Sequence, residues 1–149
     1  MKPVFIFAYG SNLDEAQMQA RCASAQMECR AVLPHHGLVF GGFSQRWGGA
    51  VANAVPEQGG QVEGVLYRIE AADLRCLDRH EGHPFAYERV QMEVVDRSGA
   101  RRPAHVYVQP GEGFEACSPP AGYLRVLWLA YQRLGFDVRA LVVAAGLVG

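Results

Sequence analysis

The sequence predicts an α+β domain in which a curled sheet or a small barrel carries helices on its outside. Strand-like segments fill the middle of the chain, and helix-like segments lie at its start, centre and end. With 149 residues, the chain can bury roughly 70% of the surface that its unfolded form exposes, so its core needs neither a disulfide nor a structural metal. We expect one domain over residues 1–149, without repeats or a linker.

The composition argues against several classes of protein. Half of the residues are apolar and 19% are charged, which is unlike an extensively disordered chain. The 14 basic and 15 acidic residues give a net charge of −1 at pH 7, without the basic surplus that binding to nucleic acid or to an anionic membrane requires. We therefore expect neither nucleic acid nor a membrane among its partners.

The first elements follow from an apolar run and the polar turn behind it. Val4–Ala8 is continuously apolar and leads into Tyr9-Gly10-Ser11-Asn12, which predicts a buried strand that ends in a tight turn. Asn12 or Asp14 can cap a helix that runs to about Cys22. Two strands are expected next, over Met27–Leu33 and Gly37–Phe43, broken at Pro34.

The middle of the chain alternates between glycine-rich and strand-like segments. Phe40–Gly49 holds four glycines and predicts a loop that can lie over a site. Ala71–His80 predicts a helix, which Gly82 can end in the left-handed conformation. Between them we expect a strand over Ala50–Val55, a turn over Glu57–Gly60 and an alternating strand over Val62–Ile69.

The last third predicts a hairpin and two helices. The strands Tyr87–Asp96 and Pro103–Gln109 precede a loop rich in proline and glycine over residues 110–120. Apolar residues at i, i+4, i+7 and i+11 predict an amphipathic helix over Ala121–Leu134, and Phe136–Ala145 predicts a last short helix. The apolar end, Ala140–Val148, is less than half a membrane span, so it packs on the domain or on a second subunit, which leaves a homodimer as one alternative.

Nothing in the sequence marks the chain for export. The apolar start, Pro3–Ala8, is too short for a signal peptide and has no cleavage site behind it. The cysteines form no C-x-x-C pair, and we expect reduced thiols and a cytoplasmic location. They are Cys22, Cys29, Cys76 and Cys117.

Glu81 is the sharpest candidate for chemistry. In helical projection Leu74, Leu77, Asp78 and Glu81 lie within about 100° of one another, so Glu81 points inward with the two leucines. Burial is costly for a carboxylate, and the negative end of the helix dipole lies at this last turn. Both effects raise the pKa of Glu81 toward the range where a carboxyl gives and takes protons near pH 7. The alternative is a frayed helix end that leaves Glu81 in solvent.

The turn Tyr9-Gly10-Ser11-Asn12 is the second candidate. A strand that runs into Gly-Ser-Asn can direct successive backbone N–H groups at one point, where they bind a carboxylate or a developing oxyanion. Asn12 at a helix start adds the positive end of a helix dipole. The alternative is an ordinary connection between a strand and a helix.

Other chemistries lack their motifs. His80 and His83 flank Glu81 without the H-E-x-x-H spacing of zinc peptidases, and the adjacent His35 and His36 would point to opposite faces of a strand. We therefore expect no metal site. The chain also has no G-x-S-x-G elbow and no glycine-rich phosphate loop, which argues against a serine hydrolase and a nucleotide-binding enzyme.

Five motifs, taken in order, make the sequence resemble the γ-glutamylcyclotransferase family, which includes the AIG2-like proteins. The resemblance covers roughly residues 3–135. The motifs are Tyr9-Gly10-Ser11-Asn12-Leu13, Trp47-Gly48-Gly49-Ala50, Val62-x-Gly64-Val65-Leu66-Tyr67, Leu77-Asp78-x-x-Glu81-Gly82 followed by Tyr87, and Ser118-Pro119-Pro120-x-x-Tyr123.

The resemblance implies a small β-barrel with flanking helices and an enzyme of the acyltransferase or amine-lyase type. Such an enzyme cyclises a γ-glutamyl group to 5-oxoproline and releases an amine, without a metal or an organic cofactor. The substrate's own α-amine is the nucleophile, so one carboxyl can take its proton and return it to the leaving amine. The resemblance assigns the acid/base role to Glu81, substrate binding to Tyr9, Gly10, Ser11 and Asn12, and supporting roles to Tyr87 and Tyr123.

Two other functions stay open. The same fold can act on another amide or ester, such as a γ-glutamyl protecting group in a biosynthesis, or it can bind a small carboxylate without catalysis. The acid at Glu81 argues against a binding module, which has no need of a buried carboxyl. Glutathione-specific members of the family tend to carry Y-G-S-L where this chain has Asn12, so the resemblance favours another γ-glutamyl compound, whose leaving amine the sequence does not identify.

Overall fold

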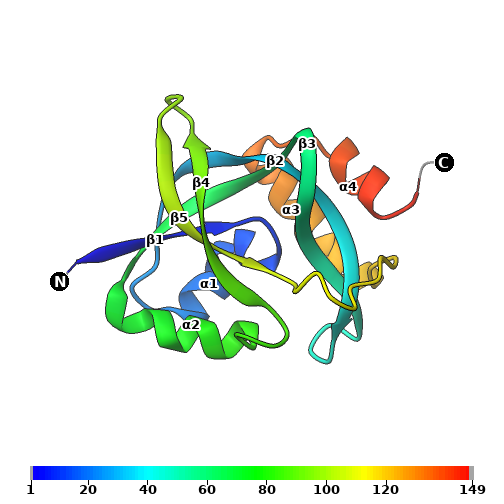
Figure 1. Ribbon diagram of the computed structural model, residues 1–149, viewed down its shortest axis with the longest axis horizontal. Helices are drawn as coiled ribbons and strands as arrows, with labels where there is room; N and C mark the ends of the chain where they lie inside the picture. The colour runs from blue at the N-terminus through cyan, green and yellow to red at the C-terminus, as the bar shows by residue number, and fades with distance from the viewer. Residues whose placement is uncertain (1, 148–149) are drawn as a thin grey trace.

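The computed structural model describes residues 2–147 and consists of a closed five-stranded barrel with helices on its outside (Figure 1). The strand order is β1-β3-β2-β4-β5, and β1 pairs antiparallel with β3 and parallel with β5, which makes the barrel mixed. The predicted α+β class and small barrel are confirmed. The strands are β1 (Pro3–Ala8), β2 (Gln26–Ser44), β3 (Gly49–Glu70), β4 (Glu88–Asp96) and β5 (Arg101–Val108).

The strands β2 and β3 are longer than predicted. Pro34 does not break β2, and Glu57–Gly60 belongs to β3 instead of forming a turn. The two strands pair antiparallel along most of their length, with a register shift between Pro34 and His36. His35 takes a φ of 59° at this bulge. A bulge accommodates a proline, which cannot donate to the ladder, so the strand bends there without ending.

The loop predicted over Phe40–Gly49 is much shorter in the structure. β2 continues to Ser44 and β3 starts at Gly49, so the loop shrinks to the tip between them. Gln109 supports the strand ends below this tip, because its Nε2 donates to the carbonyl of Gly41 at 3.1 Å. We call residues 43–47, which are the last two residues of β2 and the first three of the turn that follows, the β2–β3 tip.

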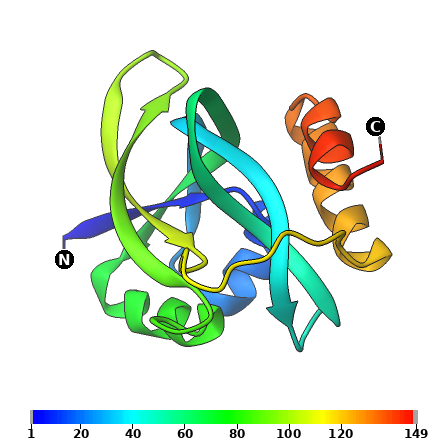
Figure 2. The ribbon, with the colours of Figure 1, turned by 45° about the vertical axis from the view of Figure 1, so that its right-hand side comes forward.

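Two short helices follow 3-10 turns and lie below the barrel in Figures 1 and 2. They are α1 (Glu15–Arg21) after η1 (Ser11–Leu13), and α2 (Leu74–Glu81) after η2 (Ala71–Asp73). Asp14 caps α1, since its Oδ1 accepts from the backbone N of Ala16 at 3.2 Å. Gly82 ends α2 with a φ of 71°, as predicted. The helix therefore persists to Glu81.

The C-terminal helices stand along one side of the barrel (Figure 2). In α3 (Ala121–Leu134) the buried residues Tyr123, Leu127 and Ala130 follow the predicted stripe. The last helix, α4 (Arg139–Ala144), is shorter than expected and buries Leu141 against the core. Val148, the end of the predicted apolar tail, lies outside the described residues. No helix of residues 2–147 is long and apolar enough to cross a membrane.

Candidate active site

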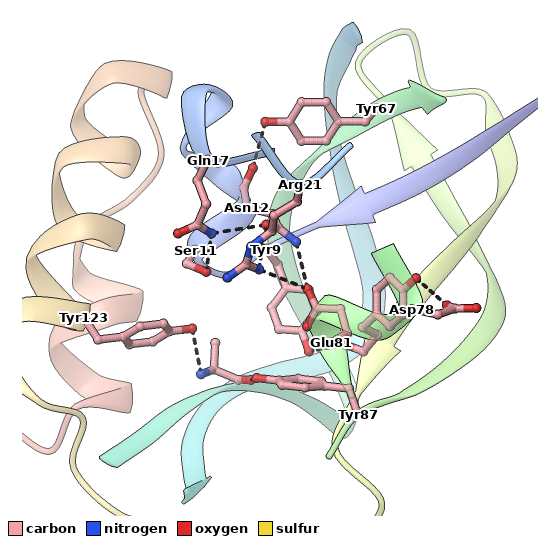
Figure 3. A network of polar contacts seen from close by, with 12 residues as sticks. Tyr9, Ser11, Asn12, Gln17, Arg21, Tyr67, Asp78, Glu81, Tyr87 and Tyr123 are labelled. Carbon is pink, nitrogen blue, oxygen red and sulfur yellow. Dashed lines mark hydrogen bonds and ion pairs between the residues drawn. The ribbon is translucent and has the colours of Figure 1, made fainter. Parts of the chain in front are cut away.

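The structure brings Glu81 and the Tyr9–Asn12 turn together, although 69 positions separate Asn12 from Glu81. Asn12 Nδ2 donates to Oε1 of Glu81 at 2.9 Å (Figure 3). The Glu81 side chain is 13% exposed, so it points inward from the last turn of α2 and does not reach bulk solvent. The inward placement that helical periodicity predicts is therefore confirmed, and the frayed end is not found.

Arg21, which sequence reasoning missed, is the third member of this group. Its Nη1 lies 3.6 Å from Oε1 of Glu81 and donates to Oδ1 of Asn12 at 3.2 Å. The side chain is 9% exposed, and its Nε is buried without a hydrogen-bond partner. A signal existed in the sequence: Met18 is a buried apolar residue of α1, and Arg21 follows it by three positions on the same face.

The environment of Glu81 makes its carboxyl harder to ionise than an ordinary glutamate. Burial raises the pKa of Glu81, and this effect exceeds the lowering by the charge of Arg21 and by the hydrogen bond from Asn12. The charge of Asp78 raises the pKa of Glu81 further. A carboxyl shifted in this direction is suited to taking up and giving back a proton near neutral pH.

Asp78, one turn earlier on α2, is shifted the other way. Burial raises its pKa, but the hydrogen bonds from Arg89 and Tyr107, together with the positive charges of Arg89 and His83, lower it by more. Arg89 donates through Nε at 2.8 Å, and the Tyr107 hydroxyl donates at 2.6 Å. The pKa values of Asp78 and Glu81, on one face of the same helix, are thus shifted in opposite directions. Asp78 is the charged, structural carboxylate, and Glu81 is the one that can exchange protons.

Hydrogen bonds from outside the Tyr9–Asn12 turn hold its polar groups in one orientation. The Tyr67 hydroxyl donates to the Asn12 carbonyl at 2.7 Å. Gln17 Nε2 donates to Ser11 Oγ at 2.7 Å and to Asn12 Oδ1 at 3.2 Å. Because Oδ1 accepts from both Gln17 and Arg21, the amide nitrogen of Asn12 is the end that faces Glu81.

Tyr87 and Tyr123 approach the same site from opposite sides and meet at Ala52 of β3 (Figure 3). The Tyr87 hydroxyl donates to the Ala52 carbonyl at 2.6 Å, and the Tyr123 hydroxyl accepts from the Ala52 N–H at 3.0 Å. A Cβ atom on Gly10 would lie 3.1 Å from the Tyr123 hydroxyl, so any larger residue here would push that hydroxyl by a few tenths of an ångström. Burial raises the pKa of Tyr9, Tyr87 and Tyr123, which keeps their hydroxyls protonated.

Two adjacent cavities share Glu81 in their walls. The inner cavity, of about 50 Å³, is lined by the whole predicted set: Tyr9, Gly10, Ser11, Asn12, Glu81, Tyr87 and Tyr123, with Ala52 and Tyr107 beside them. The outer cavity, of about 540 Å³, shares Ser11, Glu81, Tyr87 and Tyr123 with the inner one and reaches the β2–β3 tip. The segment expected to lie over a site is therefore at the mouth, as a tip and not as a long loop.

The histidines considered as metal ligands do not assemble around Glu81. His83 Nδ1 accepts from the backbone N of Arg89 at 3.0 Å, while His80 is exposed. Within residues 2–147, no group of three or more histidine, cysteine, aspartate or glutamate side chains is placed to hold a metal ion.

The fold and the site define a small mixed barrel with one buried carboxyl facing a Gly-Ser-Asn turn. Residues 6–125 match the family model described as "Gamma-glutamyl cyclotransferase, AIG2-like". The chain belongs to this family.

Relatives of known name agree with this assignment. The chain is 31% identical over 134 residues to a protein of Mus musculus named γ-glutamylcyclotransferase, an alignment that covers 87% of this chain and 70% of the mouse protein. A Homo sapiens protein of the same name is 28% identical over 137 residues, with 89% and 72% covered. A solved structure titled "Gamma-glutamyl cyclotransferase" superposes with a TM-score of 0.87 at 25% identity, over 96% of this chain and 86% of that one.

Proposed function

We propose that the protein is a γ-glutamylcyclotransferase that cleaves a γ-glutamyl amide by cyclising the glutamyl group to 5-oxoproline and releasing an amine or amino acid. The observation that carries the proposal is the contact between Asn12 and Glu81, which places a buried carboxyl of raised pKa against the Gly-Ser-Asn turn. Family membership and the names of the relatives support the γ-glutamyl substrate.

The inner cavity is the proposed place of the glutamyl group. Its walls combine hydroxyls, the Asn12 amide and the Glu81 carboxyl with apolar side chains such as Ile6 and Phe7, which suits a small group that has both polar ends and a short apolar chain. Holding the chain folded back brings the α-amine against the γ-carbonyl, so the attack becomes intramolecular and needs no nucleophile from the protein. Backbone N–H groups of Gly10 and Ser11 are proposed to stabilise the oxyanion that forms on the γ-carbonyl.

Glu81 is proposed to move the protons of both steps. As a carboxylate it takes a proton from the α-ammonium group, and the free amine then attacks the γ-carbonyl to form the ring C–N bond. As a carboxylic acid it returns a proton to the nitrogen of the original amide, whose C–N bond breaks. Glu81, a carboxylate again after this transfer, takes the remaining extra proton from the ring nitrogen and passes it to the departing amine, so the products are the neutral lactam and the amine in its ammonium form.

Arg21 is proposed as the residue that keeps Glu81 ready to act first as a base. Burial raises the pKa of the Glu81 carboxyl and so favours its protonated form, and the guanidinium 3.6 Å away opposes this. Because Arg21 also contacts Asn12 Oδ1, one cation orients both partners of the carboxyl. Tyr87 and Tyr123 are proposed to hold the peptide of Ala52 as a rigid wall.

The test is turnover of a panel of γ-glutamyl compounds by the purified protein, with 5-oxoproline measured by chromatography. The panel holds γ-glutamyl-alanine, γ-glutamyl-ε-lysine, γ-glutamyl-propylamide and glutathione. Release of 5-oxoproline from at least one compound, lost in a Glu81→Gln variant, supports the proposal. A folded protein that releases none from any of them overturns it.

We also propose a compartment, a domain organisation and an oligomeric state for the protein. The four cysteines are free in the structure, which fits a reducing compartment such as the cytoplasm. We treat residues 1–149 as one domain, because strands and helices share one buried core. The exposed Val143 and Leu147 make a homodimer through the C-terminal segment a hypothesis that sedimentation can test.

A further inference from the structure

The outer cavity concentrates positive charge at the mouth of the site. Four basic side chains line it, whereas Glu81 is the one acidic side chain among the described residues of its wall. The basic residues are Arg21, Arg46, Arg79 and His80. The whole chain has a net charge of −1, so this excess is not a property of the surface at large.

Two of these cations have no counter-charge of their own. Arg21 is paired with Glu81, but within residues 2–147 neither Arg46 nor Arg79 forms an ion pair with an acidic side chain. Both are exposed. Unpaired guanidinium groups around a cavity favour a ligand that brings negative charge, since they bind carboxylates through two parallel N–H bonds.

The cations come from two elements that the fold brings together. Arg46 lies in the β2–β3 tip, with its guanidinium 5.7 Å from the centre of the Trp47 ring. The Trp47 ring packs edge-on against Tyr123 at 5.1 Å, which links this tip to the wall of the inner cavity. On the other side, Arg79 and His80 project from the last turn of α2.

The pKa of His80 shifts in the direction that neighbouring positive charges produce. Although His80 is largely exposed, loss of hydration, and then the positive charges of Arg21, Arg46 and Arg79, lower the pKa of its imidazole. No acidic group contributes to this shift. The imidazole therefore adds a neutral hydrogen-bonding group, and three guanidinium groups supply the field.

The positions of Arg46 and Arg79 determine which part of a bound substrate they can contact. The two cavities share Ser11, Glu81, Tyr87 and Tyr123 in their walls, so a glutamyl group in the inner cavity would direct its amide toward the outer one. Resting on the proposed function, we propose that Arg46 and Arg79 bind a carboxylate carried by the leaving amine and disfavour cationic leaving amines. Arg46 is the main determinant, and the adjoining Phe43 and Trp47 offer an apolar wall beside the carboxylate.

Three substrates of similar size and different charge test this selection. They are γ-glutamyl-β-alanine, with an anionic leaving group, γ-glutamyl-propylamide, with a neutral one, and γ-glutamyl-1,3-diaminopropane, with a cationic one. The wild-type protein should prefer them in that order in kcat/KM, and high salt should narrow the differences because the arginines are solvent-exposed.

Variants of Arg46 and Arg79 assign the effect. Arg46→Gln should lower the ratio of kcat/KM for the anionic over the neutral substrate about 2- to 5-fold, the range for one ion pair at an exposed site. Arg46→Glu should reverse the preference between the anionic and cationic substrates, and Arg79→Gln should lower the ratio less. Arg75→Gln is the matched control, because Arg75 is an exposed arginine on α2 outside the outer cavity, and it should keep the wild-type ratio.

Binding measurements separate this inference from the proposed function. Calorimetric titration of the same three compounds into a Glu81→Gln variant measures charge preference without turnover. Absence of turnover in the wild type overturns the function, while a preference for the anionic compound in binding still supports the arginines. Equal affinity for all three compounds, or an Arg46→Gln change that weakens all three alike, overturns the selection by charge.

Discussion

Replacement of Glu81 by glutamine separates the chemical role of this side chain from its structural one. The amide keeps the shape of the carboxyl and keeps Oε1 as an acceptor for Asn12 Nδ2, but it cannot exchange a proton. General acid–base catalysis typically contributes about 10²–10⁴-fold to the rate. Because the same carboxyl is proposed to act in both proton transfers, we expect kcat/KM to fall toward the upper end, about 10⁴-fold.

The structure predicts a much smaller effect on stability. Arg21 loses its counter-charge at 3.6 Å, and its Nε already lacks a partner, but its contact with Asn12 Oδ1 remains. A neutral amide is also easier to bury than a carboxyl whose pKa burial has raised. We expect a loss of about 1–2 kcal/mol in the free energy of unfolding, from a weakened contact to a charged group. For a chain of this size that is a decrease in Tm of about 2–8 °C.

The assay is 5-oxoproline release from the best compound of the γ-glutamyl panel, together with thermal unfolding of each variant. Glu88→Gln is the control, because Glu88 is an exposed glutamate at the start of β4 and lines neither cavity. A Glu81→Gln variant with near-wild-type turnover would refute the acid/base role. A variant that fails to fold would refute the account of the Glu81 environment.

Four further predictions follow from the same contacts. Arg21→Met removes the charge that lowers the pKa of Glu81, so the acid limb of the plot of kcat/KM against pH should move to higher pH. Arg21→Lys restores a positive charge and should move this limb part of the way back. A limb that does not move in Arg21→Met contradicts the proposed role of Arg21. Tyr87→Phe removes the 2.6 Å donor of the Ala52 carbonyl and leaves the longer 3.5 Å contact from Gln109 Nε2, so the free energy of unfolding in urea should fall by about 0.5–1.5 kcal/mol. Burial raises the pKa of Asp78 but hydrogen bonds from Arg89 and Tyr107 lower it below its unfolded value, so the stabilisation is full above the unfolded pKa, about 3.9, and is lost as pH falls through the folded pKa. The wild type should therefore lose more stability than Asp78→Asn over that acid window in pH-dependent urea unfolding. Exhaustive chelation should leave turnover and Tm unchanged, and metal-dependent turnover would contradict the proposed mechanism.

Local signals in the sequence determined most of the elements and the direction of Glu81. Helical periodicity placed Glu81 on the inward face of α2, and Gly82 marked the end of that helix with its left-handed backbone. The apolar stripe of α3 predicted the burial of Tyr123. These features depend on residues within one or two turns of one another, so spacing along the chain carries them.

The long strands show where local preference fails. Pro34 is a local signal for the end of a strand, but β2 continues through it because pairing with β3 supplies many contacts on both sides of the bulge. The same pairing absorbed Glu57–Gly60 into β3. Pairing of this kind depends on which strand lies alongside, and a short window of sequence does not contain that partner.

The sequence predicted the candidate residues of the site but not the contacts between them. The identities of Glu81 and the Tyr9–Asn12 turn are readable as candidates, but their contact arises because β1 pairs with β3 and β5, which places the turn beside α2. Arg21 joins them because α1 docks on α2, and Ala52 lies between Tyr87 and Tyr123 because α3 stands against the barrel. Tertiary structure alone decides these meetings, because closure of the barrel brings together groups that no spacing along the chain relates.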